Sequence, residues 1–415
     1  MRVSMITLMI ALIVFPAASG AEEAVITLKD LEQEALKNNP EIAMAGKKTE
    51  SAKEKVSVAS AMPDPEIGYQ IQNVGALGTS TVGIEEMSMQ GFVVSQEIPF
   101  PGKLSTKGNA AHKQAEREQE NSRATKLRIL SSLRSAYFDY YLAYQTADIL
   151  EQNKEIMKNF QHIAETRFAT GQGIQQDVLR AQLEVSMLIE KLTMQEQKKE
   201  AQRTSINALL GRDPRGPLER PGNSLATTYP AGLDDLSARA LEHSPMLAGK
   251  RRMVEQSEYE LSTSKREYLP DMTVSAGRFE RGGLKDVWQA SVMFKVPLYF
   301  WNKSAAVRAA DADLHSARYE YDADKLATLS RVKELYTMAK TSEQLLNLYD
   351  TGILPQARLA LQSATMNYQV GKVDFLSLLE SQSVLFQYQL QYENELVNLN
   401  RTISMIHEIT GEDEQ

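Results

Sequence analysis

The chain has 415 residues, a formal net charge of −8 and no cysteine. The absence of cysteine excludes disulfides, thiol catalysis and thiolate metal sites. An acidic balance without a strongly basic block argues against nucleic acid as a partner. The length would suit two or three ordinary domains.

Residues 1–21 have the pattern of a secretory signal peptide. Arg2 is followed by an apolar run from Met5 to Phe15 and then by small residues up to Ala21. The run is too short to cross a bilayer as a helix, which takes ~20 apolar residues. No later stretch approaches that length, so we expect a secreted chain that helices do not anchor in a membrane.

The first half of the mature chain predicts one helix that two strands separate from a long helical hairpin. One apolar seam, from Leu127 to Ala147 at steps of three and four, predicts a single helix of about 100 Å that ends at Gly171. A proline-rich stop follows the first helix, and the two strands alternate polar and apolar residues. In chain order the expected helix, strands, long helix and returning helix span 27–60, 66–72, 89–98, 103–170 and 174–210.

The second half predicts the same order of elements. We expect Gly352 and Pro355 to kink its long helix, because the first half has neither residue at that point. By length, the short helices of each half would stack end to end beside the long one. The expected ranges are 233–267, 272–279, 287–296, about 300–370 and 374–409.

Sequence matches between the halves indicate a duplicated unit. Leu127 to Tyr137 reappears as Leu326 to Tyr336, and Phe168-x-x-Gly171 reappears as Tyr368-x-x-Gly371. Asp177-Val178-Leu179 is matched with Asp374-Phe375-Leu376. Several matches in one order are typical of an internal repeat. The expected organisation is a signal peptide, first repeat, linker, second repeat and tail at 1–21, 22–210, 211–232, 233–411 and 412–415.

The four strands have the alternation of a membrane β-barrel, in which one face meets lipid and the other meets water. A spanning barrel must be closed, and the smallest known have about eight strands. Four strands per chain are too few. If the strands span a membrane, several chains must share one barrel; otherwise they form a small soluble sheet at the end of a helical bundle.

The motif order resembles that of the TolC-type outer-membrane efflux proteins over residues 26–411. The resemblance rests on the duplicated helix–strand–strand–helix unit, on the Tyr368-x-x-Gly371 turn and on Asp374-Phe375-Leu376. The stretch from Ser95 to Lys103 is similar to the branch that serves heavy-metal and drug efflux pumps of the resistance-nodulation-division (RND) type.

The resemblance implies a mainly α fold with a small β part, in which each chain adds four strands to a trimeric outer-membrane barrel and long helices to a coiled-coil tunnel through the periplasm. The implied partners are two further copies, outer-membrane lipid, a periplasmic adaptor protein and an inner-membrane RND pump. The implied function is the exit duct of a tripartite pump for small molecules or metal ions, as in heavy metal resistance. Alternatives are an exit channel for type I protein secretion and a soluble periplasmic adaptor.

Five residues at the hairpin turns are the candidate site. Gly171, Gly173 and Gly371 permit tight turns, and Asp177 and Asp374 begin the returning helices, where carboxylates are favoured. The resemblance implies that the carboxylate at Asp374 faces the closed mouth of the tunnel, where three copies would form a cation-attracting ring. Simple helix capping is the alternative for both aspartates.

No motif indicates an enzyme, and no catalytic, cofactor-binding or metal-binding residue is predicted. The five histidines are scattered without ligand spacing. Met87 and Met89 could contact a soft metal ion, although packing at a strand end is the simpler interpretation. Tyr137, Tyr140 and Tyr144 have the spacing of a packing seam.

Overall fold

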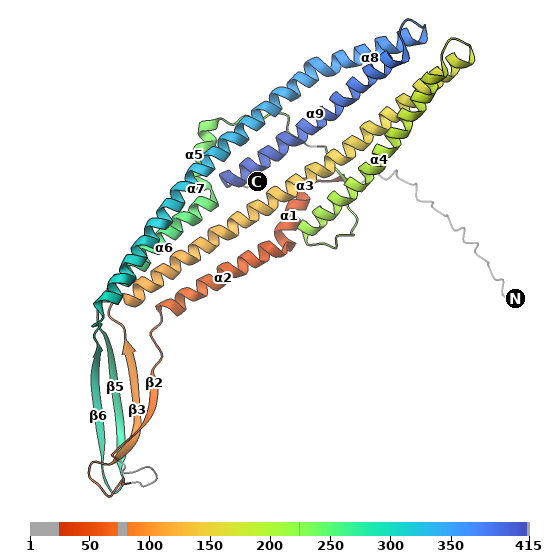
Figure 1. Ribbon diagram of the computed structural model, residues 1–415. Helices are drawn as coiled ribbons and strands as arrows, with labels where there is room; N and C mark the ends of the chain where they lie inside the picture. The colour runs from red at the N-terminus through yellow and green to blue at the C-terminus, as the bar shows by residue number, and fades with distance from the viewer. Residues whose placement is uncertain (1–24, 74–80, 224, 413–415) are drawn as a thin grey trace, which may run out of the picture.

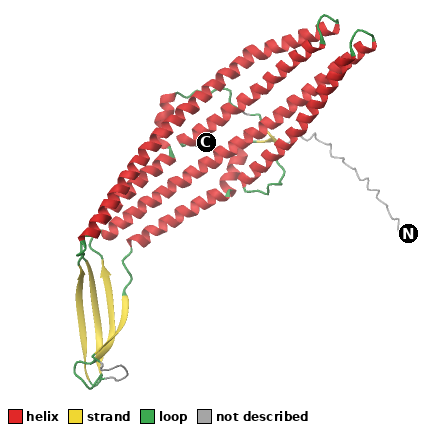
Figure 2. Ribbon diagram, viewed as in Figure 1, coloured by secondary structure: helices red, strands yellow, loops and turns green. Residues whose placement is uncertain are grey.

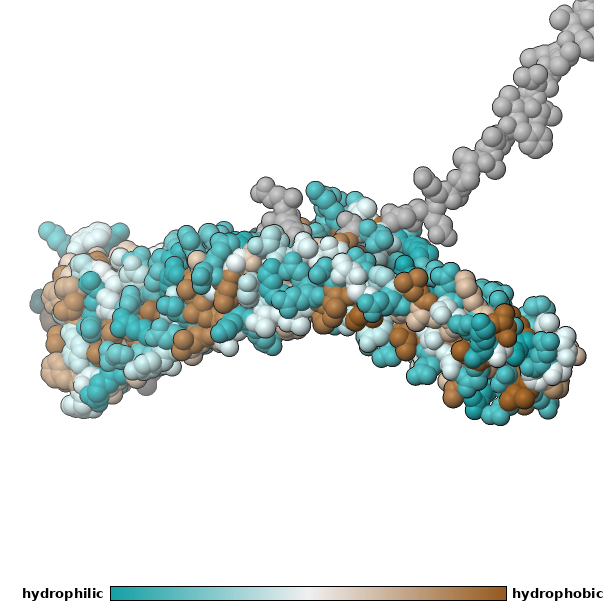
Figure 3. Space-filling view, turned by 90° about the horizontal axis from the view of Figure 1, so that it is seen from above, coloured by the Kyte–Doolittle hydropathy of each residue, from teal (hydrophilic) through white to brown (hydrophobic). Residues whose placement is uncertain are grey.

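The computed structural model describes residues 25–73, 81–223 and 225–412 of the chain. The expected signal peptide and all but the first residue of the expected tail lie outside this part. The molecule is elongated, with a β-sheet at one end and the tips of two helical hairpins at the other (Figure 1). Its apolar residues appear in separate patches among polar ones along the helical part (Figure 3).

The two halves repeat the same order of elements, as the sequence predicts. The first half contains β1 (Val25–Ile26), α1 (Leu28–Asn38), α2 (Pro40–Ser60), β2 (Glu66–Gln72), β3 (Met89–Ile98), α3 (Lys103–Ala169) and α4 (Gln175–Leu210). The second contains β4 (Arg220–Pro221), α5 (Leu233–His243), α6 (Pro245–Arg266), β5 (Asp271–Arg281), β6 (Leu284–Lys295), α7 (Phe300–Leu348), the π-helix η1 (Tyr349–Ile353), α8 (Leu354–Gln369) and α9 (Phe375–Thr410).

The expectation of one helix at the start of each repeat is wrong, because each divides before a proline. Asn39 and Ser244 have non-helical backbones, with ψ of 124° and 117°. The ring of a following proline disfavours helical geometry at the preceding residue, whereas proline itself is favoured in the first turn of a helix. The side chain of Asn39 accepts hydrogen bonds from the N–H groups of Glu41 and Ile42 and starts α2 anew.

The C-terminal end of α4 packs against the break between α1 and α2, and that of α9 packs against the break between α5 and α6. Gly211 ends α4 with φ of 71°, and a Cβ there would lie 2.7 Å from the carbonyl oxygen of Asn38. Gly411 ends α9 with φ of 73°, and a Cβ there would lie 2.3 Å from the carbonyl oxygen of His243. The returning helices therefore abut the breaks, and α2 with α4 forms a two-part rod along α3 (Figure 1). The expected stacking holds for α2 and not for α1, which turns aside.

The sheet joins the two repeats (Figure 2). Its order is β2-β3-β5-β6 with every pair antiparallel, so β3 of the first repeat pairs with β5 of the second. The hydroxyls of Ser95 and Ser275 lie 3.0 Å apart at this central pair. β5 and β6 are longer than predicted because they continue to a tight turn at Gly282, whose φ is 66°.

The two faces of the sheet differ in polarity, although the more apolar face also carries Arg278 and the opposite face also carries Val93 and Met293. The register places apolar side chains on one face, and the described part of the chain leaves them exposed: Ile67, Tyr69, Ile71, Phe92, Val94, Val274, Trp288, Val292 and Phe294. The opposite face carries Gln70, Ser95, Ser275 and Gln289, with Phe279 fully buried against Gly277. This is the pattern of a sheet between lipid and water.

The segment expected as a linker packs as a belt across both repeats in its described residues, 211–223 and 225–232. The hydroxyl of Tyr137 lies 3.3 Å from the carbonyl oxygen of Ile26 and 3.2 Å from that of Gly222, beside the β1–β4 pair. Asn400 of α9 exchanges hydrogen bonds of 2.9 and 2.8 Å with the backbone of Ala226. The tyrosine seam of α3 therefore supplies both packing and hydrogen bonds.

Candidate functional site

The two hairpin turns have the same conformation. The N–H of Gln172 bonds the carbonyl of Arg167 at 2.8 Å, and the N–H of Lys372 bonds that of Asn367 at 2.9 Å. Gly171 and Gly371 both adopt the left-handed region, with φ of 73° and 74°. Glycine enters this region without a Cβ clash, which is why it ends so many helices.

This equivalence corrects the match between the two aspartates. The returning helices begin after Ile174 in the first turn and after Asp374 in the second, and both turns have the same length. Asp374 therefore corresponds to Ile174, and Asp177 corresponds to Ser377. Sequence matching had aligned the Asp-x-Leu triplets, which lie one helical turn apart in the two copies.

Asp374 is the N-cap of α9. Its carboxylate accepts hydrogen bonds from the N–H and the hydroxyl of Ser377, at 2.9 and 2.5 Å. These bonds lower the pKa of Asp374 below its usual value, with the Ser377 hydroxyl as the largest contribution. The carboxylate is exposed and remains charged at the tip of the molecule.

Asp177 lies in the first turn of α4 and does not cap the helix. Its carboxylate accepts a hydrogen bond from the hydroxyl of Tyr368 at 3.4 Å. Tyr368 is the last buried residue of α8, so this bond joins the first hairpin to the second. Burial, reinforced by the negative charge of Asp177, raises the pKa of Tyr368 to about 12, and the hydroxyl stays protonated as a donor at neutral pH.

Arg167, which sequence reasoning missed, completes this contact. Its guanidinium donates to the carbonyl oxygen of Tyr368 and, at 3.0 Å, to that of Gln172. The same group lies over the Tyr368 ring, 4.7 Å from its centroid. A Cβ on Gly371 would lie 3.2 Å from this guanidinium, and one on Gly173 would lie 3.1 Å from the Arg167 Cβ.

The only sequence signal was an arginine before Phe168 that the second copy lacks. We call Arg167, Tyr368 and Asp177 the tip clasp.

A hydrophobic cluster beneath the clasp also spans both hairpins. Ala164 of α3 and Ala181 of α4 pack with Tyr368, Phe375 and Leu378 of the second hairpin. The rings of Tyr368 and Phe375 lie 5.4 Å apart. The tips are therefore held together by apolar packing and by polar contacts of named residues.

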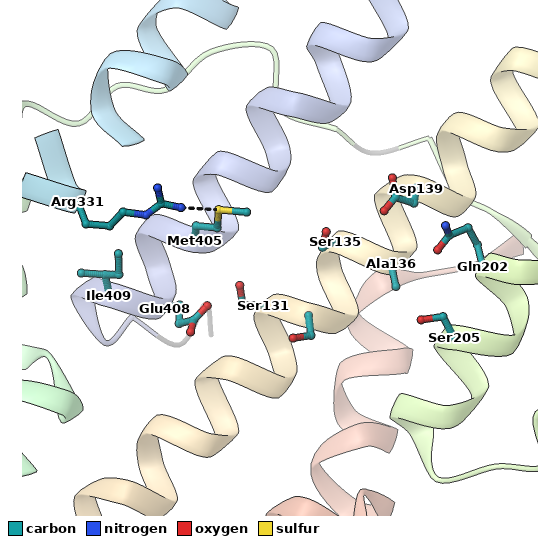
Figure 4. A pocket seen from close by; sticks show the side chains of 11 residues that line it. Ser131, Ser135, Ala136, Asp139, Gln202, Ser205, Arg331, Met405, Glu408 and Ile409 are labelled. Atoms are coloured by element: carbon teal, nitrogen blue, oxygen red, sulfur yellow. Dashed lines mark hydrogen bonds between the residues drawn. The ribbon is translucent and has the colours of Figure 1, made fainter. Parts of the chain in front are cut away.

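Further along the helices, α3, α4, α7 and α9 border an open groove of about 540 Å³ (Figure 4). It lies on the face of α3 opposite the tyrosines that hold the belt. Its walls carry Ser131, Ser135, Asp139 and Glu408, and Arg331 donates to the sulfur of Met405 at 3.6 Å. The residues that line the groove include no histidine.

Two further properties concern the described residues alone. None of their helices combines the length and hydrophobicity needed to cross a membrane. Their histidine, aspartate and glutamate side chains form no group of three or more that could hold a metal ion. Met87 is exposed. Ser88 is buried, and its hydroxyl donates a hydrogen bond of 2.5 Å to the carbonyl oxygen of Asn73.

The fold and the tips define a long helical duct protein with a membrane-facing sheet. The profile of the outer membrane efflux protein family matches residues 31–212 and 236–411, and the chain belongs to that family. It is an outer-membrane efflux channel that extends into the periplasm. This assignment overturns the alternative of a soluble periplasmic adaptor.

Individual relatives match over most of their length. The cobalt-zinc-cadmium resistance protein CzcC of Cupriavidus metallidurans is 23% identical over 404 residues, which cover 96% of this chain and 92% of CzcC. The cation efflux system protein CusC of Escherichia coli K12 is 20% identical over 380 residues, covering 86% and 80%. The solved structure of the outer-membrane channel OprN has the same fold, with a TM-score of 0.80 at 19% identity, over 92% of this chain and 89% of OprN.

Proposed function

We propose that three copies of this chain close into one duct, which receives metal cations from a periplasmic adaptor and an inner-membrane RND pump and releases them outside the cell. The observation that carries the proposal is that the wall built by the described part of one chain has two open edges. The first edge is formed by α2, β2 and α4, and the second by β6, α7 and α8.

The sheet supports closure by several copies. Its outer strands β2 and β6 have no partner on their free sides within the described chain, and such edges readily pair with another strand. A strand edge in lipid would leave backbone groups without partners, at several kcal/mol each. One exposed apolar face and one polar face suit a barrel wall. Three copies would give twelve strands, which is more than the minimum of about eight found in the smallest barrels.

The aromatic residues where β6 passes into α7 support contact with outer-membrane lipid. Tyr299, Phe300 and Trp301 are exposed beyond half of their surface, at 69%, 56% and 70%. Aromatic side chains at this level commonly sit among lipid headgroups. They would form a girdle at the periplasmic boundary of the barrel.

The helical edges carry matching apolar side chains near the tips. On α4, Leu179 and Leu183 are 56% and 59% exposed. On α8, Leu359 and Met366 are 66% and 56% exposed. Counted at ~1.5 Å per residue, Leu183 lies about 12 Å from the tip end of α4 and Leu359 about 15 Å from that of α8. The two patches would meet when α4 of one copy packs on α8 of the next.

The cargo and pump partners rest on the relatives. CzcC is named for cobalt, zinc and cadmium resistance, and CusC for cation efflux. We assign divalent metal ions as the cargo of this chain on that basis. We assign the adaptor and the pump as its partners because a duct has no energy source of its own. Export of a secreted protein is the alternative outcome.

The hairpin tips would form the periplasmic mouth. Gly171, Gly173 and Gly371 shape the turns, and Asp177 contributes to the tip clasp. Asp374, repeated in each copy, would place a ring of exposed carboxylates at the entrance, which attracts cations. This role is compatible with helix capping, because the capping bonds leave the charge in place.

Cysteine cross-linking tests the assembly. The chain has no native cysteine, so Leu183→Cys with Leu359→Cys introduces a single reactive pair. We expect oxidation in outer-membrane vesicles to give covalent dimers and trimers, whereas either single variant gives none. Recovery of monomers only would contradict the proposed edges.

Metal export is tested separately. Deletion of the gene should lower the zinc, cobalt or cadmium concentration that stops growth, and the wild-type chain should restore it. An unchanged metal tolerance with loss of a secreted protein from the medium would support the protein-export alternative instead.

A further inference from the structure

A polar cleft lies between α3 and α6 close to the sheet, where these two helices run side by side (Figure 1). Its volume of about 620 Å³ falls within the ~300–1,000 Å³ of small-molecule sites. Its lining includes Ser105 and Asn109 of α3 and Tyr259, Ser262 and Arg266 of α6. We call it the junction cleft.

Arg266 is the one cation of the cleft that has no partner among the described residues. Its guanidinium makes no hydrogen bond or ion pair with them, and its Nε is buried. The guanidinium lies against the backbone of Gly102, where a Cβ would be 3.0 Å from its carbon Cζ. A partly buried cation without a counter-charge costs free energy. Arg266 is therefore held ready for an anion.

The carboxylates beside the cleft do not supply that anion, because each is paired with another cation. A Glu255 oxygen lies 2.9 Å from Nζ of Lys113 and 2.9 Å from Nη1 of Arg252. A Glu258 oxygen lies 2.8 Å from Nη2 of Arg318. The four uncharged side chains named above make no hydrogen bond within the described chain. Neutral hydrogen-bonding groups and one unpaired guanidinium are thus available to a ligand.

The guanidinium is not a feature of the duplicated unit. Pro40 and Pro245 begin α2 and α6, and counting from them makes Ala61 the counterpart of Arg266. The first repeat therefore has a methyl group where the second has a cation. Since α2 leads into its strand without a charge there, the role of Arg266 lies outside the folding of the unit.

The polar face of the sheet continues along one side of α3. Asp271 lies on that face of β5 with Ser275 and is bonded by Lys103 in the first turn of α3. Ser135 borders the groove of Figure 4 and follows Lys103 after about nine helical turns, so it lies on the same side. In the proposed duct the polar face lines the interior, and the groove side of α3 lines it as well.

The junction cleft is on the opposite side of the wall. Met246 of α6 borders an adjoining groove together with Arg331, which lines both grooves. Glu255 borders the cleft and follows Met246 after about two and a half turns, so it points the other way. Arg266 follows Glu255 after about three turns and shares its side. The cleft therefore faces outward, as the apolar face of the sheet does.

The cleft also lies at the level of the aromatic residues that follow β6. Glu267, next to Arg266, has an oxygen 3.5 Å from Nζ of Lys303. Lys303 follows Trp301, which is 70% exposed, by two residues. Aromatic girdles mark the level of lipid headgroups. An outward cleft at this level meets the phosphate layer of the membrane.

We propose that the junction cleft binds the phosphate of a glycerophospholipid from the inner leaflet of the outer membrane, with Arg266 as the principal contact. A guanidinium can donate to two phosphate oxygens at once, and the hydroxyl groups of the cleft add further donors. The bound lipid fixes the height of the channel in the membrane. The inference rests on the proposed placement of the sheet in the outer membrane.

Lipid titration of the purified protein in detergent, followed by native mass spectrometry, tests the site. Phosphatidylglycerol should bind the wild type at least tenfold more tightly than diacylglycerol with the same acyl chains, which lacks the phosphate. Arg266→Gln should abolish this difference, and Arg266→Lys should restore part of it. Equal binding of the two lipids to the wild type would overturn the proposal.

The matched control for the titration is Arg251→Gln. Arg251 is an exposed arginine of the same helix, about 22 Å farther from the sheet at ~1.5 Å per residue. This variant should bind phosphatidylglycerol as the wild type does. An equal loss in the Arg251 and Arg266 variants would show a general charge effect and would also overturn the site.

Thermal unfolding separates binding from a structural role. Because Arg266 has no partner in the described chain, Arg266→Gln should unfold in lipid-free detergent at or above the wild-type midpoint; a lower midpoint would contradict the proposal. Phosphatidylglycerol should raise the midpoint of the wild type and not that of the variant. Inorganic phosphate at the same concentration should raise neither. An equal rise with inorganic phosphate, lost in the variant, would overturn the assignment to lipid.

Placement in the membrane is decided separately. The chain has two tryptophans, so Trp288→Phe leaves the fluorescence of Trp301 alone. In vesicles of phosphatidylcholine brominated on its acyl chains, this fluorescence should be quenched. If it is not quenched, the proposed placement of the sheet fails, whereas the titration in detergent still decides whether the cleft binds a phospholipid phosphate.

Discussion

The guanidinium of Arg167 lies 4.7 Å from the centroid of the Tyr368 ring, so that the last turn of α3 covers the last turn of α8. The same arginine donates to the Tyr368 carbonyl, and the Tyr368 hydroxyl donates back to Asp177 of the first hairpin. Each hairpin therefore supplies a partner to the other. Contacts of this kind hold two helical tips at a set distance.

Arg167→Ala should loosen the tips. It removes a cation–π contact of about 0.5–1 kcal/mol and hydrogen bonds to two carbonyls, each about 1 kcal/mol or more. We expect larger and more frequent openings in planar lipid bilayers. Arg358→Ala, at an exposed position on α8, is the control and should leave the openings unchanged. Identical traces for the two variants would remove the clasp from the gating argument.

Ser377→Ala should change how cation selectivity depends on pH. The Ser377 hydrogen bonds hold the pKa of Asp374 below its usual value. The negative charge of Asp374 therefore persists as the pH falls and is lost only when the pH drops below this lowered pKa. Without the hydroxyl, the pKa should rise toward its ordinary range, and selectivity should fade at a higher pH. Reversal potentials measured from pH 3 to 7 provide the test, with Asp374→Asn as the uncharged reference. A shift to lower pH would contradict the assignment.

Gly211→Ala and Gly411→Ala should destabilise the protein to a similar extent. Both glycines have positive φ, and an added Cβ would press on a carbonyl oxygen of the facing helix break. We expect a loss of about 2 kcal/mol for each. Gly232→Ala is the control, because nothing lies within 4 Å of a Cβ there. The midpoint of thermal unfolding in detergent measures the difference, and equal midpoints for all three would refute the argument.

Lys103→Met should destabilise the junction of the sheet and the helices. Lys103 is 3% exposed and bonds the Asp271 carboxylate and the Leu269 carbonyl, both at 2.9 Å. Loss of one partner from a buried ion pair typically costs about 3–5 kcal/mol. Adding Asp271→Asn should recover part of the loss. Lys107→Met, at a half-exposed lysine, should change the unfolding midpoint little.

Much of the fold follows from patterns along the chain. The seam from Leu127 to Ala147 predicts the long helix because a helix buries one face at every third or fourth residue. Gly171 and Gly371 mark the turns because each ends a helix in a conformation that favours glycine. The breaks before Pro40 and Pro245 could also have been predicted, since the residue before a proline resists helical geometry. The apolar periodicity that continues past both prolines concealed them.

The tip clasp could not have been predicted in the same way. Arg167 and Tyr368 are 201 residues apart, and their contact depends on how two hairpins pack side by side. Sequence matching also paired Asp177 with Asp374, although the turns place them in different positions of their helices. A short motif reports residue order, whereas the position in a turn depends on where backbone hydrogen bonds end.

The sequence alone determined the duplication, the long helical hairpins and the alternation of the strands, because each follows from a pattern along the chain. Only the tertiary structure decided that the segment between the repeats is a belt, that α1 turns aside from the rod of α2 and α4, and that Arg167 bridges the hairpins. These features arise from contacts between residues far apart in the chain. Local spacing carries no information about such contacts until the long helices are set beside one another.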